Sequence, residues 1–178
     1  MATKKTSMFT LTERLTLTAN STATTATIDL ASYVDVADRQ AIQVHSVDFI
    51  YQGSTAGEVL QVTFNADSET SIQVTDLNRG GLVFANDRAL VASGQLNLDH
   101  TNNTLSSDAD MYPDNYGKGS DDGRYVVNDQ LYLTAQTTGL DTAGGKSLNI
   151  TVRVNCSVVS LGAKDFMAIA IQSTAADN

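Results

Sequence analysis

The chain of 178 residues has one cysteine, one proline and no tryptophan. A single cysteine cannot form a disulfide within the chain, so packing and backbone hydrogen bonds must stabilise the fold. No stretch approaches the run of about 18 apolar residues that a membrane-spanning helix needs, and the N-terminal residues lack the apolar segment of a secretory signal. The sequence therefore predicts no transmembrane segment and no export signal.

Glutamate is scarce, with three residues against seventeen aspartates, and the net charge is −9. Aspartate favours turns and loops because its short side chain bonds to nearby backbone amides, whereas glutamate favours helices. The eleven basic residues are scattered, and Lys4 and Lys5 are the one adjacent pair. Phosphate contacts need clustered Lys or Arg, so we expect little or no direct contact with nucleic acid.

Catalytic motifs are missing as well. The sequence contains no nucleophile elbow, phosphate-binding loop, dinucleotide fingerprint or zinc-protease motif. Several predicted strands separate the two histidines, and His45 is interpreted as a hydrogen-bonded structural residue. Without Trp and with three Glu, a glycosidase cleft or sugar-stacking platform has little support. We expect a protein that is not an enzyme.

The chain does contain a long alternating pattern near residue 150. Apolar residues stand at every second position, namely Leu148, Ile150, Val152, Val154, Cys156 and Val158, with polar residues between them. A side-chain period of two predicts a β-strand with one buried and one wet face. Cys156 is on the buried face and is predicted to be an inert thiol.

Similar patterns recur along the chain. A change of parity between Val44 and Val47 indicates a β-bulge, and the segment 59–64 is predicted to form a hairpin with the strand before it. One short helix is expected near Asp87–Val91 or Asp35–Gln40, and the tract 20–25 is either extended or disordered. Strands are predicted at 8–18, 26–30, 41–51, 59–64, 71–75, 82–84, 90–92, 95–98, 125–127, 130–135, 148–161 and 166–172.

This number of short strands, in a chain that is 42% hydrophobic and long enough for one core, indicates a single all-β domain. We predict an antiparallel β-sandwich, with a closed barrel as the other architecture. The longest interruption runs from 99 to 123 and is rich in aspartate. Calcium binds to oxygen ligands, which loops rich in aspartate supply. The candidate calcium ligands are Asp108, Asp110, Asp114, Asp121 and Asp122. No glutamate closes the loop, so the alternative is a solvated acidic loop on the outer surface.

The segments Ile28–Tyr33 (IDLASY) and Arg39–Ile50 (RQAIQVHSVDFI) resemble the single jelly-roll capsid proteins of icosahedral viruses. Chain length, strand number, one long inserted loop and a short polar N-terminal extension agree with this resemblance. It implies a flexible extension at 1–8, a single jelly-roll domain at 9–172 and a C-terminal tail at 173–178.

The resemblance further implies a self-assembling capsid subunit, made in the host cytoplasm and located in the virion. Its partners would be copies of itself and other capsid proteins. The chain departs from many such capsids by lacking a basic arm, which better suits a shell separated from the genome by a membrane or another protein. A surface adhesin, spike or fibre domain that binds a host receptor or glycan is the alternative function. A third class, an enzyme or ligand-binding barrel, would need a deep pocket lined by His45 or the aspartate loop.

Overall fold

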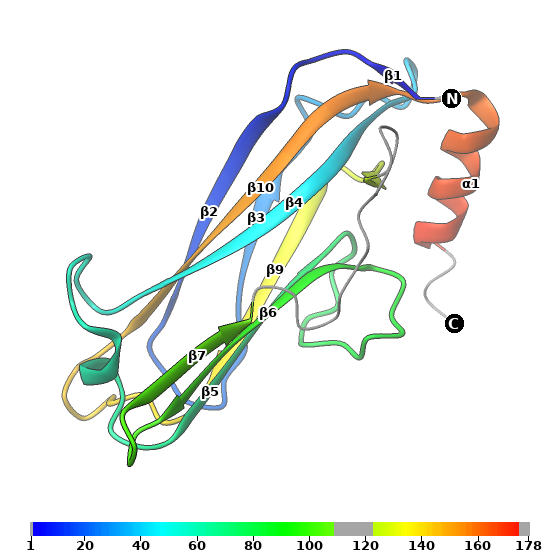
Figure 1. Ribbon diagram of the computed structural model, residues 1–178. Coiled ribbons are helices and arrows are strands. Elements are labelled where there is room, and N and C mark those ends of the chain that lie inside the picture. The colour runs from blue at the N-terminus through cyan, green and yellow to red at the C-terminus, as the bar shows by residue number, and fades with distance from the viewer. Residues whose placement is uncertain (1, 109–122, 175–178) are drawn as a thin grey trace.

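The structure, a computed structural model, describes residues 2–108 and 123–174, which fold into two antiparallel β-sheets packed face to face (Figure 1). The predicted all-β sandwich is confirmed. The first sheet contains β1 (Thr3–Lys4), β2 (Phe9–Leu17), β4 (Gln40–Gln52), β8 (Arg124–Val126) and β10 (Leu148–Ser160). The second sheet contains β3 (Thr24–Asp29), β5 (Ser68–Thr75), β6 (Leu90–Asp99), β7 (Thr104–Asp108) and β9 (Gln130–Thr137).

Strand β10 is the centre of the first sheet, as its long alternating pattern suggests. Leu148, Ile150, Val152, Val154 and Cys156 are all fully buried, which confirms the predicted inward face. The strand pairs with β2 along one edge and with β4 along the other, and β1 continues the β2 edge. Because β10 binds three strands that precede it by many residues, long-range contacts dominate this sheet.

The strand pairings are nested. β2 pairs with β10, β3 with β9, β4 with β8 and β5 with β6. Strands from the beginning of this series therefore pair with strands from its end, and each later strand pairs with an earlier partner. Two further pairings, β10 with β4 and β9 with β5, complete the sheets. From β2 to β5, successive strands lie in alternate sheets, and each connection crosses from one sheet to the other.

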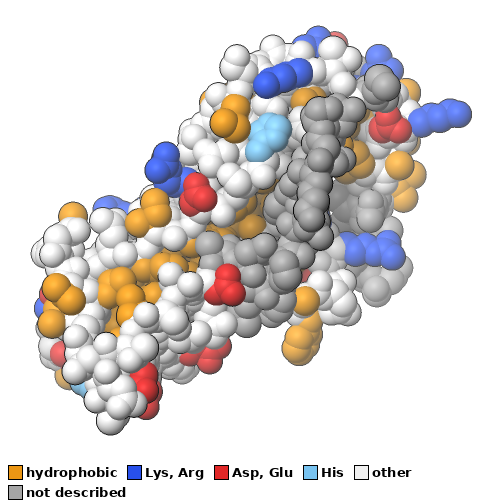
Figure 2. Space-filling model, viewed as in Figure 1, with side chains coloured by type: hydrophobic (Ala, Val, Ile, Leu, Met, Phe, Trp, Pro, Cys, Tyr) orange, Lys and Arg blue, Asp and Glu red, His pale blue; other side chains and the backbone are white. Residues whose placement is uncertain are grey.

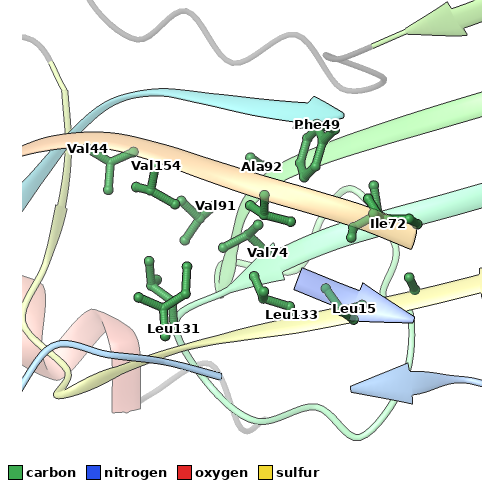
Figure 3. Close-up of a cluster of buried hydrophobic side chains, with 14 of the residues drawn as sticks. Leu15, Val44, Phe49, Ile72, Val74, Val91, Ala92, Leu131, Leu133 and Val154 are labelled. Atoms are coloured by element: carbon green, nitrogen blue, oxygen red, sulfur yellow. The ribbon is translucent and has the colours of Figure 1, made fainter. Parts of the chain in front are cut away.

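The core lies between the two sheets. In Figure 3, Val44 and Val154 of the first sheet point toward Val74, Leu131 and Leu133 of the second. All five side chains are fully buried. Burial of such aliphatic side chains is the main stabilising contribution in a chain without disulfides.

The predicted β-bulge in β4 is confirmed. Opposite β4, the register changes between Asn155 and Cys156, whose partners are Ser46 and Val44. His45 is therefore the extra residue, and after it the inward-facing positions change from even-numbered to odd-numbered residues. As a result, apolar side chains before and after the bulge both face the core.

The predicted strand at 59–64 is wrong. Leu60–Thr63 form a short 3-10 helix, η1, and Val62 is exposed. Only Phe64 contacts a strand-like partner, through a single bridge to Leu140. Local bonds such as Phe64 N–H to the Gln61 carbonyl satisfy the backbone instead, and no hairpin forms with β4.

The predicted strand at 166–172 is also wrong, because Ala163–Thr174 form the helix α1. An unbroken apolar run does not distinguish strand from helix, and burial here follows the helical spacing. Phe166 is buried while Ile169 and Ala170, three and four residues later, are half-buried against the same cluster. Asp165 in the first turn favours the helix because it interacts with the positive end of the helix dipole.

Neither site predicted for a short helix is helical. Asp35–Gln40 is a turn closed by a bridge between its end residues, and Arg39 has a φ of 53°. Of Asp87–Val91, the last two residues begin β6. β6 also joins the two strands predicted at 90–92 and 95–98, because Gly94 continues the pairing with β5.

Four other expectations need correction. Residues 82–84 lie in a loop and not in a strand. The predicted loop 99–123 contains β7, which pairs with β6. Within the expected flexible extension at 1–8, Thr3–Lys4 pair with β10, so these two residues belong to the sheet. α1 continues past residue 172 into the segment expected as a tail.

Candidate functional site

The candidate calcium ligands fall largely on residues that the structure does not describe. Asp108 ends β7 and is exposed, whereas Asp110, Asp114, Asp121 and Asp122 lie outside the described residues. Among residues 2–108 and 123–174, no group of three or more His, Cys, Asp or Glu side chains is placed to hold a metal ion. The calcium site therefore stays a prediction.

Asp108 is electrostatically coupled to Tyr51 of the opposite sheet. Burial, and to a lesser degree the negative charge of Asp108, raise the pKa of the Tyr51 hydroxyl. That hydroxyl is buried and has no hydrogen-bond partner among the described residues. The first of the five predicted carboxylates thus lies near enough to Tyr51 for its charge to act on that hydroxyl.

The outer edge of β4 is a candidate surface for association. β8 pairs only with Ile42–Val44, and no other described strand pairs with β4 on the side away from β10. Unpaired edge groups can hydrogen-bond to a strand from another chain. Figure 2 shows hydrophobic side chains in a hollow on this side of the molecule, toward the end opposite α1.

The histidines and the cysteine occupy structural positions. His45 Nε2 lies 2.9 Å from Ser157 Oγ, which confirms the predicted hydrogen bond. Burial and the nearby Lys4 lower the pKa of His45. His100 follows β6 in the other sheet, where its backbone N–H donates to Asp67. Burial raises the pKa of the Cys156 thiol to about 11, so it is neutral at physiological pH.

Two ion pairs anchor the loop between β5 and β6. Arg79 Nε lies 3.0 Å from Asp87 Oδ2 within the loop. Arg124 Nη2 lies 3.2 Å from Asp76 Oδ2, and this pair joins β8 of the first sheet to the end of β5 in the second. Burial raises the pKa of the Asp76 carboxyl, while Arg124 opposes that change.

The side chain of Gln73 fixes the middle of the same loop. Its amide nitrogen donates to the Val83 carbonyl at 2.8 Å, and its amide oxygen accepts from the Val83 N–H at 2.7 Å. Gln73 is 5% exposed, so this amide clamp is shielded from water. The clamp holds Leu82 and Phe84 over the outer face of the second sheet, and Phe84 is 84% exposed.

The clamped loop and the sheet enclose a groove of about 270 Å³, which we call the Phe84 groove. Polar side chains of β5 and β6 line it together with Leu82 and Phe84. A second hollow of about 290 Å³ lies on the outer face of β3 and β9, beside Asn78 and Tyr132. No sequence motif indicates the Phe84 groove, because residues 82–84 fit the pattern of an ordinary strand.

Large hydrophobic side chains are exposed at several further places. On α1, Phe166 faces the sheet, whereas Met167 and Ile171 are 57% and 59% exposed and lie one turn apart on another face. Contiguous exposed apolar surface commonly marks an interaction site. Among the described residues, the other exposed large hydrophobic ones are Met8, Val36, Ile50, Val59, Val62, Leu82, Phe84 and Leu105.

No known protein-family model matches the sequence, and no curated protein matches it either. No described helix has the length and apolar character needed to cross a membrane.

Proposed function

We propose that the protein is a structural subunit that assembles with copies of itself, as the capsid (coat) subunit of an icosahedral virus with a single jelly-roll fold. The observation that carries this proposal is the nested pairing of strands. Viral capsid domains are prominent among proteins built on the jelly roll, which also serves lectins and cupins. Fold alone does not decide among these functions, so surface properties must support the choice.

The jelly-roll assignment follows from how a long hairpin wraps around a core. In a hairpin of eight strand segments, the first pairs with the eighth, the second with the seventh, and so on inward. Wrapping the hairpin brings the eighth segment beside the third and the seventh beside the fourth. Omitting β1 and β7, the strands β2–β6 and β8–β10 have all six of these pairings.

The exposed apolar side chains support self-association. Met167 and Ile171 on α1, and Val36 in a nearby turn, are each more than half exposed. Leu161 N–H donates to the Arg39 carbonyl, which ties this turn to the chain just before α1. Val59, just before η1, and Val62, within it, are also exposed. A shell subunit needs several separate contact surfaces, and packing against other copies would remove these side chains from water.

Charge argues for a shell with little direct nucleic-acid contact. The chain carries −9 overall, and Lys4, one of its two adjacent lysines, is part of β1. In the assembled virion, other capsid proteins or a membrane would then lie between this shell and the genome. The subunit would be made in the host cytoplasm. Calcium bound by the aspartate-rich segment 108–122 would reduce repulsion between neighbouring acidic subunits.

Electron microscopy of the purified full-length protein tests the proposal, together with light scattering. We expect closed particles or discrete capsomers. Replacing Met167 and Ile171 by Asp should reduce assembly, while the same two charges at the exposed Thr22 and Thr142 should not. A chain that stays monomeric across protein concentration, salt and calcium would contradict the proposal.

A surface adhesin, spike or fibre domain is the second candidate. The exposed aromatic ring of Phe84 beside a polar groove favours it, since such a surface suits a host receptor or glycan. A stable small oligomer, such as a trimer, that never forms shells and binds glycans would favour this function over the capsid.

A further inference from the structure

We propose that the Phe84 groove is a binding site for a neutral saccharide, with the ring of Phe84 stacked on the apolar face of one sugar and the groove polar groups bonded to its hydroxyls. The inference rests on the binding function proposed above as the alternative. It is also compatible with a shell subunit whose outer face contacts a glycan.

The first observation is the anchored backbone beside the exposed aromatic ring. Phe84 is 84% exposed although it follows directly on Val83, whose N–H and carbonyl are both bonded to the buried Gln73 amide. The Arg79–Asp87 pair braces the same loop at its base. A ring on a fixed backbone loses little conformational freedom when a ligand stacks on it.

The second observation is an unsatisfied hydroxyl group at the floor of the groove. Ser93 is 2% exposed, lines the groove, and stands directly opposite Gln73 in the β5–β6 pairing. Its Oγ is buried and has no hydrogen-bond partner among the described residues. Buried polar atoms are normally bonded, so the groove is suited to a ligand or water that supplies this bond.

The polar lining indicates which ligand fits. Glu69 and Ser71 stand on the same outer face of β5 as Gln73, and Gln95 donates to Glu69 Oε1 at 2.8 Å. Carboxylate, hydroxyl and amide groups match the donors and acceptors of a sugar. No Lys or Arg is among the described residues that line the groove, and the Glu69 charge repels anions. A neutral sugar is therefore favoured over a sialylated or phosphorylated one.

The size of the groove limits the contact to a small part of a glycan. About 270 Å³ is at the lower end of the range for ligand sites, and the groove is open to solvent. One sugar ring would occupy it while the rest of the glycan extended away. Affinity at a single groove would be weak, and many copies on one particle would strengthen attachment by multivalency.

Saturation-transfer NMR of the full-length protein with a panel of neutral and sialylated oligosaccharides tests the site, and this measurement works for both monomers and particles. We expect transfer to the ring protons of at least one neutral sugar. Phe84→Ala should weaken that binding about three- to tenfold, the effect of losing one aromatic contact, whereas Phe84→Tyr should retain it.

Two further variants separate recognition from folding. Ser93→Ala should weaken binding by a similar factor with an unchanged melting temperature, because its hydroxyl has no partner among the residues that the structure describes. Val59→Ala removes another exposed apolar side chain and should leave binding unchanged.

Absence of transfer to any neutral sugar, or binding that Phe84→Ala and Ser93→Ala leave intact, would overturn the site. Loss of particles in Phe84→Ala without any sugar binding would also overturn it and would mark the groove as a contact between subunits. Electron microscopy of the same samples reports assembly independently, so failure of the saccharide site is distinguishable from failure of the shell function.

Discussion

Gly94 of β6 lies directly beneath the ring of Phe49 from the opposite sheet. A Cβ atom added at Gly94 would lie 2.5 Å from Cδ2 of Phe49, closer than real Cβ contacts come. Phe49 is 9% exposed and belongs to the main core cluster. The missing side chain at 94 therefore makes room for the largest buried hydrophobic side chain of β4.

We expect Gly94→Ala to destabilise the domain by about 1–3 kcal/mol, the usual cost of overpacking a core. Urea unfolding would measure the loss. Gly57→Ala is the matched control, since a Cβ there meets nothing within 4 Å. A Gly94→Ala, Phe49→Leu double variant should recover part of the loss, and a lack of any recovery would contradict the proposed contact.

The alternating faces of β10 predict opposite responses at neighbouring positions. Val152→Asp would bury an unpaired carboxylate at a fully buried site and should cost several kcal/mol, a large part of a typical stability of about 5–15 kcal/mol. Thr151→Asp should be mild, because residue 151 is half-buried on the outer face beside Arg14. Thermal melts compare the two, and equal melting temperatures would refute the face assignment.

The Asp76–Arg124 pair should make stability depend on pH. Burial raises the pKa of Asp76 in the folded chain above its ordinary value of 3.8. At pH values between the ordinary pKa and the raised pKa, the folded chain therefore binds more protons than the unfolded chain. This residue's contribution to stability therefore falls as pH rises through that range. Arg124→Gln removes the cation that opposes this change, so the pKa of Asp76 in the folded chain should rise further. The pH range over which stability falls should then become wider.

Urea unfolding at a series of pH values tests this. The stability difference between wild type and Arg124→Gln should grow as pH rises above about 4 and shrink below it. Arg153→Gln, at an exposed arginine on the outer face of β10, is the control. A difference that is constant across pH would mean that Arg124 acts only through packing.

Calcium should raise the melting temperature of the assembled protein if the segment 108–122 binds it. Crowded carboxylates repel one another, and a bound divalent ion stabilises the state that binds it. Replacing Asp108, Asp110 and Asp114 by Asn should abolish the increase. Identical melting with calcium and with EDTA would leave the solvated acidic loop as the explanation.

Moderate salt should promote assembly. Subunits that each carry −9 repel one another at low ionic strength, and NaCl screens that repulsion. Assembly driven by nucleic acid would weaken with salt instead. Light scattering across a salt series, with and without nuclease, separates the two cases. Oligomers that disappear after nuclease treatment would reopen the role of Lys4 and Lys5.

The periodicity of apolar residues predicted the sandwich because the alternation is clearest in long strands that have one buried face and one face exposed to solvent. β10 and the bulge at His45 could be located in this way, since apolar residues stand at every second position from 148 to 158 and change parity between Val44 and Val47. Short apolar stretches could not be assigned. Residues 59–64 and 166–172 satisfy a strand pattern in sequence, but tertiary pairing and helical burial decide their structure.

The Phe84 groove was beyond sequence reasoning for a related reason. It depends on the side chain of Gln73 reaching the backbone of Val83, ten residues later, across a loop. No local pattern encodes that contact. The absence of Trp argued against a sugar platform, yet in the proposed saccharide site the exposed ring of Phe84, next to the residue bonded to the buried Gln73 amide, would take that role.

The central position of β10 also determines when the protein can fold. Its partners β2 and β4 end 131 and 96 residues before Leu148, where β10 begins, and have no other long partner among the described strands. The first sheet therefore cannot form until Leu148–Ser160 have been synthesised. Chains that end before Leu148 would expose two apolar strands with unpaired edges and should aggregate.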